Sequence, residues 1–134
     1  VHSVDRLKIA QRLSDQRPAA LGPLNICLQV NVSGEVTKSG VAPADLPALA
    51  EEVSRLPNIR LRGLMAIPEP ADDLEEQRKP FASLRALQQQ LRVAGIDTDT
   101  LSMGMSADMQ AAIAEGATIV RVGTAIFGKR DYAK

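Results

Sequence analysis

The chain has 134 residues with 16 basic and 16 acidic side chains, one histidine and one cysteine, so its formal net charge is zero. Zero net charge removes a general electrostatic attraction to nucleic acid or an anionic membrane, and a single cysteine excludes a disulfide framework and a multi-cysteine metal site. An apolar content of 45% is normal for a folded domain, and no apolar run approaches the roughly 20 residues of a spanning helix. From these features together we expect a cytoplasmic protein with a small-molecule partner.

Short β-branched runs alternate with longer amphipathic runs along the first half of the chain. The first four residues are typical of the end of a strand, and apolar residues at three-residue spacing predict a helix over residues 5–13. The nearly continuous apolar run LNICLQVNV at residues 24–32 predicts a strand covered on both faces. A polar loop separates this strand from a second helix, which begins at Pro43 and ends before Pro57.

The pattern continues with another strand and a longer helix. Residues 59–67, with the sequence IRLRGLMAI, predict a strand that Gly63 interrupts. A turn-rich segment follows, after which Pro80 is expected to open a helix with a single apolar face. Gly95 ends this helix as a left-handed cap.

The last predicted units are shorter. A strand at residues 100–103 precedes a helix for which Ser106 is the expected N-cap. The buried stripe of this helix is expected to consist of Met109, Ala112 and Ile113. A last strand at residues 118–122 and a short helical turn complete the series.

Strict alternation of strand and helix predicts right-handed βαβ crossovers and a parallel sheet. The chain holds four full strands and the remnant at its start, without an internal domain boundary. A complete (β/α)₈ barrel needs about 250 residues, roughly twice the length available. Two architectures are therefore open at this point, a small open sheet and the second half of a barrel.

Ligands of parallel α/β sheets lie beyond the carboxyl ends of the strands, and two of these ends carry phosphate-binding chemistry. After the third full strand, Gly104 permits close backbone approach, and Ser106 offers a hydroxyl beside the free N–H groups of a helix start. Gly123 and Thr124 combine the same features after the fourth strand. Two such ends side by side form a phosphate cradle. The alternative is that Ser106 only caps a helix and the glycines only serve turns.

Arg121 is a charged residue in the otherwise apolar strand TIVRV. If this strand alternates, Arg121 lies on the face opposite to Val120, and an arginine directed into a barrel needs an acceptor. An internal ion pair and a ligand contact both meet that need. The remaining reactive residues carry weaker signals: Cys27 is expected to be a small core residue, Lys38 a solvated loop residue, and His2 a structural residue.

Several motifs resemble one family over essentially the whole chain. LRGLMAIP at residues 61–68, LSMGMSADM at 101–109 and VRVGTAIFGKRDY at 120–132 are similar to signatures of the YggS/PROSC family of pyridoxal-phosphate-binding proteins. VHSVDRL at residues 1–7 and VNVSGEVTKSG at 30–40 fit the same family in the same order. The pair SMGMS and RVGTAIFG is specific, and the bacterial, YggS-like branch is the nearer one.

The resemblance implies an α/β fold of parallel (β/α) units that form the C-terminal half of a TIM (β/α)₈ barrel of the alanine racemase N-terminal-domain type. It implies pyridoxal 5'-phosphate as cofactor, and a role in homeostasis of that cofactor, as a carrier or reservoir, more than enzymatic turnover. Neither nucleic acid nor a membrane is implied as a partner. Six residues match the family's cofactor-binding positions: Met65, Met105, Ser106, Arg121, Gly123 and Thr124.

These positions have different implied roles. Ser106 and the Met105 backbone are implied phosphate contacts, together with Gly123 and Thr124. Arg121 is placed opposite the pyridine nitrogen, and Met65 and Asn31 are neighbours of the pocket. A guanidinium at that nitrogen keeps it unprotonated, which weakens the electron sink on which most chemistry of this cofactor relies.

The family's Schiff-base lysine lies on the first barrel strand, in a segment that would precede Val1, and no lysine of this chain stands in its motif. We therefore expect residues 1–134 to be a single C-terminal half-barrel, truncated on its N-terminal side, that cannot attach the cofactor covalently and has no catalytic residue. Such a half leaves two sheet edges and an apolar interior face uncovered. We expect the fragment to self-associate and the full-length protein to be a monomer.

Two other functions are open. A PLP-dependent amino-acid racemase shares the fold, but fold does not determine function, and a racemase needs a second acid–base group, usually a tyrosine. Tyr132 is the only tyrosine here, and it lies in the terminal tail. A barrel that binds a sugar phosphate would have the same cradle, but the position of Arg121 argues against it.

Overall fold

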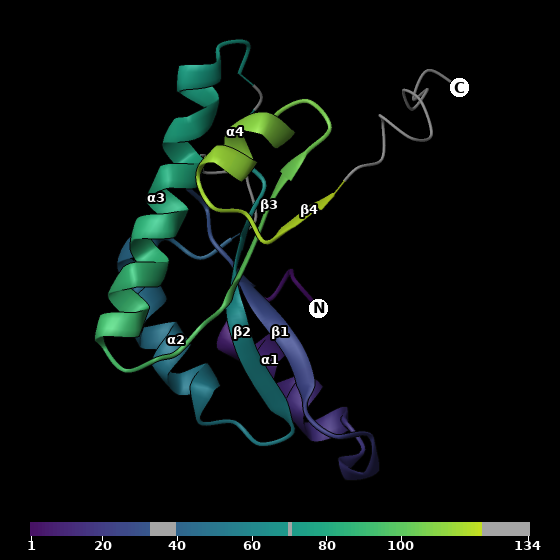
Figure 1. Cartoon of the computed structure of the whole chain (residues 1–134). Coiled ribbons are helices and arrows are strands. Elements are labelled where there is room, and N and C mark those ends of the chain that lie inside the picture. The colour runs from purple at the N-terminus through teal and green to yellow at the C-terminus, as the bar shows by residue number, and fades with distance from the viewer. Residues whose placement is uncertain (33–39, 70, 122–134) are drawn as a thin grey trace.

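Four parallel strands in the described part of the chain form one sheet, and their order in space repeats their order in the sequence (Figure 1). The sheet belongs to a computed structural model that describes residues 1–32, 40–69 and 71–121. A doubly wound sheet reverses its strand order at a switch point, whereas this sheet has no reversal. It therefore winds like the wall of a barrel, which confirms the predicted parallel α/β fold. The strands are β1 (Leu24–Gln29), β2 (Ile59–Ala66), β3 (Thr100–Met105) and β4 (Ile119–Arg121).

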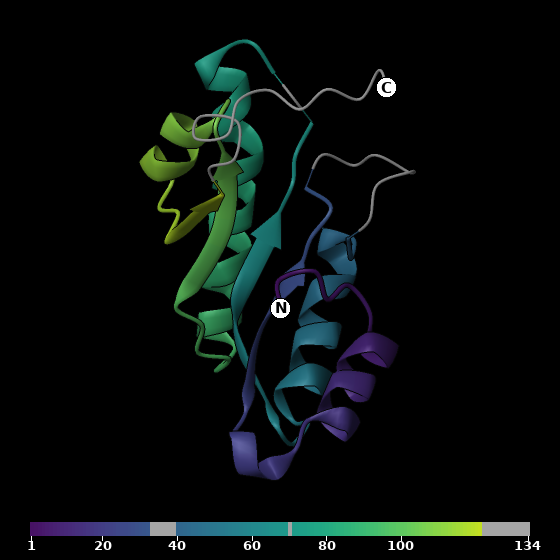
Figure 2. The same ribbon diagram turned by 90° about the vertical axis from the view of Figure 1, so that its right-hand side faces the viewer.

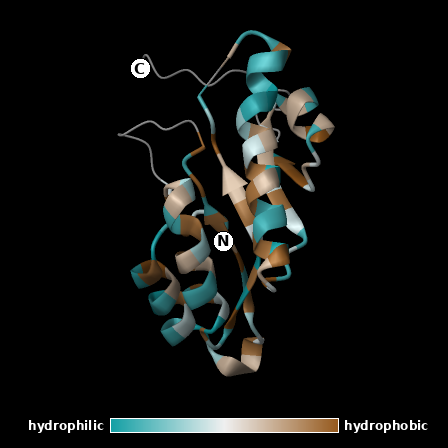
Figure 3. Cartoon of the chain, turned by 90° about the vertical axis from the view of Figure 1, so that its left-hand side faces the viewer, coloured by the Kyte–Doolittle hydropathy of each residue, from teal (hydrophilic) through white to brown (hydrophobic). Residues whose placement is uncertain are grey.

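Helices connect these strands, and in the described residues they form two pairs. Helix α1 packs against α2, and α3 packs against α4, and Figure 2 shows the two pairs as separate groups beside the sheet. Figure 3 shows that the helices carry both hydrophobic and hydrophilic residues, as amphipathic helices on a core do. The bounds are α1 (Leu7–Gln16), α2 (Leu46–Ser54), α3 (Leu74–Val93) and α4 (Met109–Ala114), with 3₁₀ turns at Ala19–Leu21 and Pro43–Asp45.

The hydrophobic core lies on one face of the sheet. Alternate residues of each strand point to opposite faces, and the core takes the set that includes Leu28, Leu64 and Leu101. These three residues lie in one row, because Leu28 pairs with Leu64 and Leu64 with Leu101. The neighbouring row belongs to the other face, where Gln29, Met65 and Ser102 are in register. One face thus carries the helices, and the row of Gln29, Met65 and Ser102 belongs to the face turned away from them.

The start of the chain adds a short strand beside β1. Val4 forms a parallel bridge with Leu28, the Cys27 N–H donates to the Val1 carbonyl at 2.8 Å, and the Gln29 N–H donates to the Val4 carbonyl at 2.7 Å. This confirms that the first four residues have strand character. Figure 2 shows this segment in front of the sheet.

The sheet curls so strongly that its free face is concave. His2 Nδ1 lies 2.8 Å from Ser102 Oγ, although β1 and β2 separate the two strands that carry these residues. Only a curved sheet brings such side chains together across its face. The concave face is mixed in polarity, so the prediction of an apolar interior face is wrong. Its residues include Cys27, Gln29, Met65, Thr100, Ser102 and Arg121.

The largest error in the predicted elements concerns α3, which begins at Leu74 and contains Pro80 in its interior. The Asp73 side chain accepts the Glu75 N–H at 3.4 Å and caps the helix, and acidic residues in the first turn favour this position. Proline fits the first turn of a helix best, and that preference misplaced the predicted start by six residues.

The predicted ends of the strands and of the last helix differ from the structure by a few residues. Strand β1 stops at Gln29 and β4 spans only three residues, whereas β3 continues to Met105. Helix α4 consequently starts after Asp108. Its buried residues are Ala111 and Ala112, while Ile113, for which the sequence predicts burial, is 58% exposed.

An ion pair at the start of β3 predicts acid sensitivity. Arg62 and Asp99 form two hydrogen bonds, of 3.0 and 2.7 Å, and these bonds, followed by one from Thr100, lower the pKa of Asp99 to about 2. The charged carboxylate stabilises the fold above its unfolded pKa near 3.9, and this contribution is lost as the pH falls towards 2. We expect Asp99→Asn to reduce the slope of stability against pH between about 4 and 2, in acid titrations followed by circular dichroism. Asp97→Asn, at an exposed neighbour, should leave that slope unchanged, and equal slopes for all three chains would contradict the prediction.

Candidate functional site

The carboxyl ends of β2, β3 and β4 meet at one edge of the concave face. Met105, at the end of β3, is in register with Arg121 at the end of β4, and Ala66 at the end of β2 is in register with Met103. This edge brings together the described members of the predicted site. Gly123, Thr124 and Lys38 lie outside the described residues.

Arg121 reaches across this edge from β4 towards β2. Its Nη2 donates to the Ala66 carbonyl at 3.2 Å, so the acceptor found in the described residues is a backbone oxygen and not an acid. Its Nε is buried and has no partner in the described part of the chain. Burial lowers the pKa of Arg121, and the charge of Asp108 opposes this shift. The guanidinium remains charged, and its Nε–H is a hydrogen-bond donor that a ligand could use.

A tight turn follows β3 at the same edge. The Met105 N–H donates to Asp108 Oδ1 at 2.7 Å, and the Asp108 N–H returns to the Met105 carbonyl at 3.2 Å. Ser106 lies within this turn and Asp108 is the residue that precedes α4, so the prediction that Ser106 is the N-cap is wrong. Aspartate at the third position after Met105 closes the turn through its carboxylate, which accepts the Met105 N–H.

Gly104, just before this turn, has a backbone conformation and a close contact that favour glycine. Its φ is +100°, and a Cβ at this position would lie 2.5 Å from the Ala112 Cβ of α4. Such a φ favours glycine. The close approach expected at Gly104 is thus made to helix α4.

Met65, a predicted pocket residue, lies on the concave face and is only 4% exposed. It is in register with Gln29 and Ser102, in the row below Arg121. Asn31, the other expected neighbour of the pocket, follows β1, where its N–H donates to the Val41 carbonyl at 2.9 Å.

Sequence reasoning did not identify the contact between His2 and Ser102. Burial, the Val1 amino group and the Arg121 guanidinium, in that order of effect, lower the pKa of His2, so the imidazole is neutral near pH 7. The two residues are 100 positions apart, so no local pattern in the sequence predicts their contact. Asp108 was missed for another reason. Its position three residues after Met105 is a pattern that the sequence shows, but Ser106 was preferred as the capping residue because of its hydroxyl.

A small cavity lies on the concave face, below the row of Gln29, Met65 and Ser102. It measures about 220 Å³ and includes His2, Cys27, Arg62 and Thr100 in its lining. Burial raises the pKa of the Cys27 thiol to about 11, so the thiol is protonated near neutral pH and is a poor nucleophile. Cys27 is buried, as expected of a small core residue, but it lies on the concave face.

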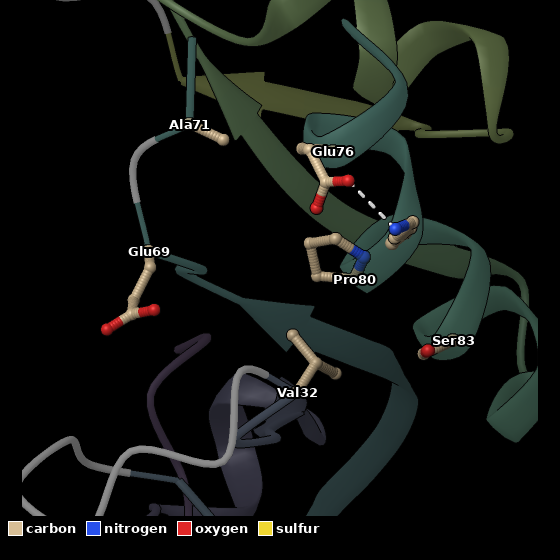
Figure 4. A pocket seen from close by; sticks show the side chains of 7 residues that line it. Val32, Glu69, Ala71, Glu76, Pro80 and Ser83 are labelled. Atoms are coloured by element: carbon tan, nitrogen blue, oxygen red, sulfur yellow. Dashed lines mark hydrogen bonds and ion pairs between the residues drawn. The ribbon is translucent and has the colours of Figure 1, made fainter. Parts of the chain in front are cut away.

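A second cavity of about 400 Å³ lies between the loop after β2 and the first half of α3 (Figure 4). Glu69 and Glu76 line it, and Glu76 pairs with Lys79 at 2.8 Å. Lys79 lines the cavity as well, so its charged side chains are two carboxylates and one ammonium. This excess of negative charge disfavours an anionic ligand. The cavity contains none of the predicted site residues, so the carboxyl edge is the better candidate site.

Two classes of site are absent from the described residues. Within residues 1–32, 40–69 and 71–121, no three His, Cys, Asp or Glu side chains gather in a way that could hold a metal ion. In the same ranges, no helix is both long enough and apolar enough to cross a bilayer.

Comparison with curated proteins identifies close relatives. Residues 1–131 match the family described as "Alanine racemase, N-terminal domain". A protein of Pseudomonas aeruginosa is 69% identical over 132 residues, which are 98% of this chain and 56% of that protein. Relatives from Vibrio cholerae and Escherichia coli are 59% and 54% identical over 100% and 99% of this chain, and 57% of each relative is covered. All three are named "Pyridoxal phosphate homeostasis protein".

Solved structures with the same fold include two related proteins. A protein of unknown function from Bifidobacterium adolescentis matches with a TM-score of 0.86 at 41% identity, over 94% of this chain and 51% of that one. PipY of Synechococcus elongatus, with PLP bound, matches with a TM-score of 0.83 at 37% identity, over 95% and 59%. The chain spans between half and three fifths of these relatives. The match over residues 1–131 shows that this chain belongs to the family of the alanine racemase N-terminal domain.

Proposed function

We propose that the whole protein binds pyridoxal 5'-phosphate (PLP) at the carboxyl edge of the concave face and serves in homeostasis of this cofactor as a carrier or reservoir. Arg121 carries the proposal, because its buried Nε has no partner among the described residues. Such an orphaned donor favours a site whose acceptor arrives with a ligand. Relatives with 54–69% identity bear the name of this role, and PipY has been solved with PLP bound.

The residues at this edge suit the two ends of the cofactor. Ser106, Gly123 and Thr124 are the proposed phosphate contacts, and Met65 lies in the lining. The Met105 N–H joins them only if Asp108, which now accepts it at 2.7 Å, yields this donor. When bound, PLP supplies an aldehyde that reacts with amines and a ring that can accept electrons.

Arg121 is the proposed neighbour of the pyridine nitrogen. A guanidinium does not give up its proton near neutral pH, so it donates to this nitrogen and keeps it unprotonated. The ring is then a weak electron sink, which fits a carrier better than an enzyme. This is the physical reason for preferring homeostasis over racemisation.

The proposed architecture follows from the length of the relatives. We propose that residues 1–134 form the C-terminal half of a (β/α)₈ barrel, and that the lysine that attaches PLP belongs to the other half. The whole protein is proposed to be a cytoplasmic monomer without nucleic acid partners. Unpaired sheet edges of a half-barrel are the proposed cause of self-association in the isolated half.

Covalent trapping separates the whole protein from the half. We expect borohydride reduction of the whole protein in the presence of PLP to modify one lysine, and the chain of residues 1–134 to give no specific modification, because it lacks the motif lysine. Peptide mass spectrometry identifies the modified residue. Failure to trap PLP on the whole protein would argue against the proposed function, and racemisation of alanine would support the enzyme alternative.

A further inference from the structure

Asp108 closes the turn that carries two of the proposed phosphate contacts. Its Oδ1 accepts the Met105 N–H at 2.7 Å, and its own N–H donates to the Met105 carbonyl at 3.2 Å. A carboxylate and a phosphate are both anionic acceptors for a backbone N–H. The Asp108 side chain therefore occupies a donor that the proposed function assigns to the phosphate.

The surroundings of this turn are held independently of Asp108. Gly104 packs directly on Ala112 of α4. At the other end of α4, the buried Glu115 accepts Arg78 Nη2 of α3 at 3.0 Å and lies 3.2 Å from Arg85 Nη2. Helix α4 is thus held on β3 by packing and on α3 by charge. Releasing the Met105 N–H requires rotation of one side chain and no movement of the helix.

Asp108 also places a negative charge near Arg121. Its charge opposes the effect of burial on the pKa of Arg121, which puts the two groups within electrostatic reach. This charge reduces the positive potential that an incoming phosphate meets at the edge. An anion at this position therefore weakens the binding of another anion.

The turn itself does not require that charge. The amide oxygen of asparagine accepts an N–H in the same geometry. The charge of Asp108 thus costs phosphate affinity and is not needed for the hydrogen bond.

We propose that Asp108 is a positioning residue and an internal competitor for phosphate: it holds the Met105 N–H in the ligand-free protein and yields it when the phosphate group binds. This inference rests on the proposed PLP site. If Asp108 acts in this way, the turn already has its binding conformation before the ligand arrives, and the affinity for PLP is limited. Limited affinity suits a protein that must release its cofactor.

Two variants of the whole protein separate the roles of charge and hydrogen bond. Asp108→Asn keeps an acceptor and removes the charge, so we expect roughly three- to fivefold tighter binding of PLP. Asp108→Ala removes both the charge and the acceptor. Because the turn then loses the bond that shapes it before the ligand arrives, this variant should bind PLP more weakly than Asp108→Asn, and equal or tighter binding would overturn the positioning role. Binding is measured by titration, and inorganic phosphate is tested separately through the rise that it causes in Tm. Pyridoxal, which has no phosphate, should bind equally to wild type and Asp108→Asn.

Asp73→Asn is the matched control, because Asp73 caps α3 through the Glu75 N–H and lies outside the site. It should leave all three ligands unaffected. Unchanged or weaker PLP binding by Asp108→Asn would overturn the proposal, and so would failure of this variant to fold. An absence of PLP binding by the wild type would instead count against the proposed function. Equal tightening towards pyridoxal would show that Asp108 does not act on the phosphate.

Discussion

Replacing Gly63 by alanine is expected to destabilise the chain by about 3 kcal/mol or more. A Cβ at this position would lie 1.7 Å from the carbonyl oxygen of Thr100, its partner in β3. The obstacle is backbone, so no side-chain rotation relieves it. The β2–β3 pairing would have to separate at this point, next to the register shift between Ile26 and Cys27.

Gly95→Ala is a suitable control for this substitution. Gly95 has φ +91°, and a Cβ added there would have nothing within 4 Å, so alanine meets only backbone strain of about 1–2 kcal/mol. Urea unfolding of both variants gives the comparison. A midpoint for Gly63→Ala equal to or above that of Gly95→Ala would contradict the close approach of β2 and β3.

Loss of the Arg121 guanidinium is expected to weaken PLP binding by the whole protein about tenfold or more, because a hydrogen bond to a charged group contributes about 1.5–3 kcal/mol. Arg121→Lys keeps the charge but loses the planar fork, so it should restore only part of the affinity. Arg121→Gln removes the charge and should also let the ring nitrogen take up a proton. The pH dependence of the absorption of bound PLP reports this change.

Folding of the Arg121 variants should be nearly unaffected. The guanidinium has one bond to a backbone carbonyl and one orphaned nitrogen among the described residues, and its burial carries a desolvation cost. Arg55→Gln is the control, since Arg55 pairs with Glu51 on the exposed surface of α2. Equal PLP affinity in Arg121→Gln, Arg55→Gln and wild type would remove the main support for the proposed site.

The segments with clear periodicity were predictable. The apolar runs that contain Leu28 and Leu64 predicted two buried strands, and alternation with helices predicted their parallel arrangement. Boundaries were less accurate where two local preferences compete. Pro80 suits a helix start, but Asp73 provides a better cap; Ser106 suits a cap, but the Asp108 carboxylate takes the Met105 N–H.

The order of elements, the parallel sheet and the edge at which polar residues gather follow from hydrophobic periodicity, which is a local property of the chain. Which groups meet at that edge depends on the folded arrangement. Arg121 finds the Ala66 carbonyl 55 residues away and His2 finds Ser102 100 residues away. Such contacts depend on strand register and on the curl of the sheet, and both arise from packing summed over many residues.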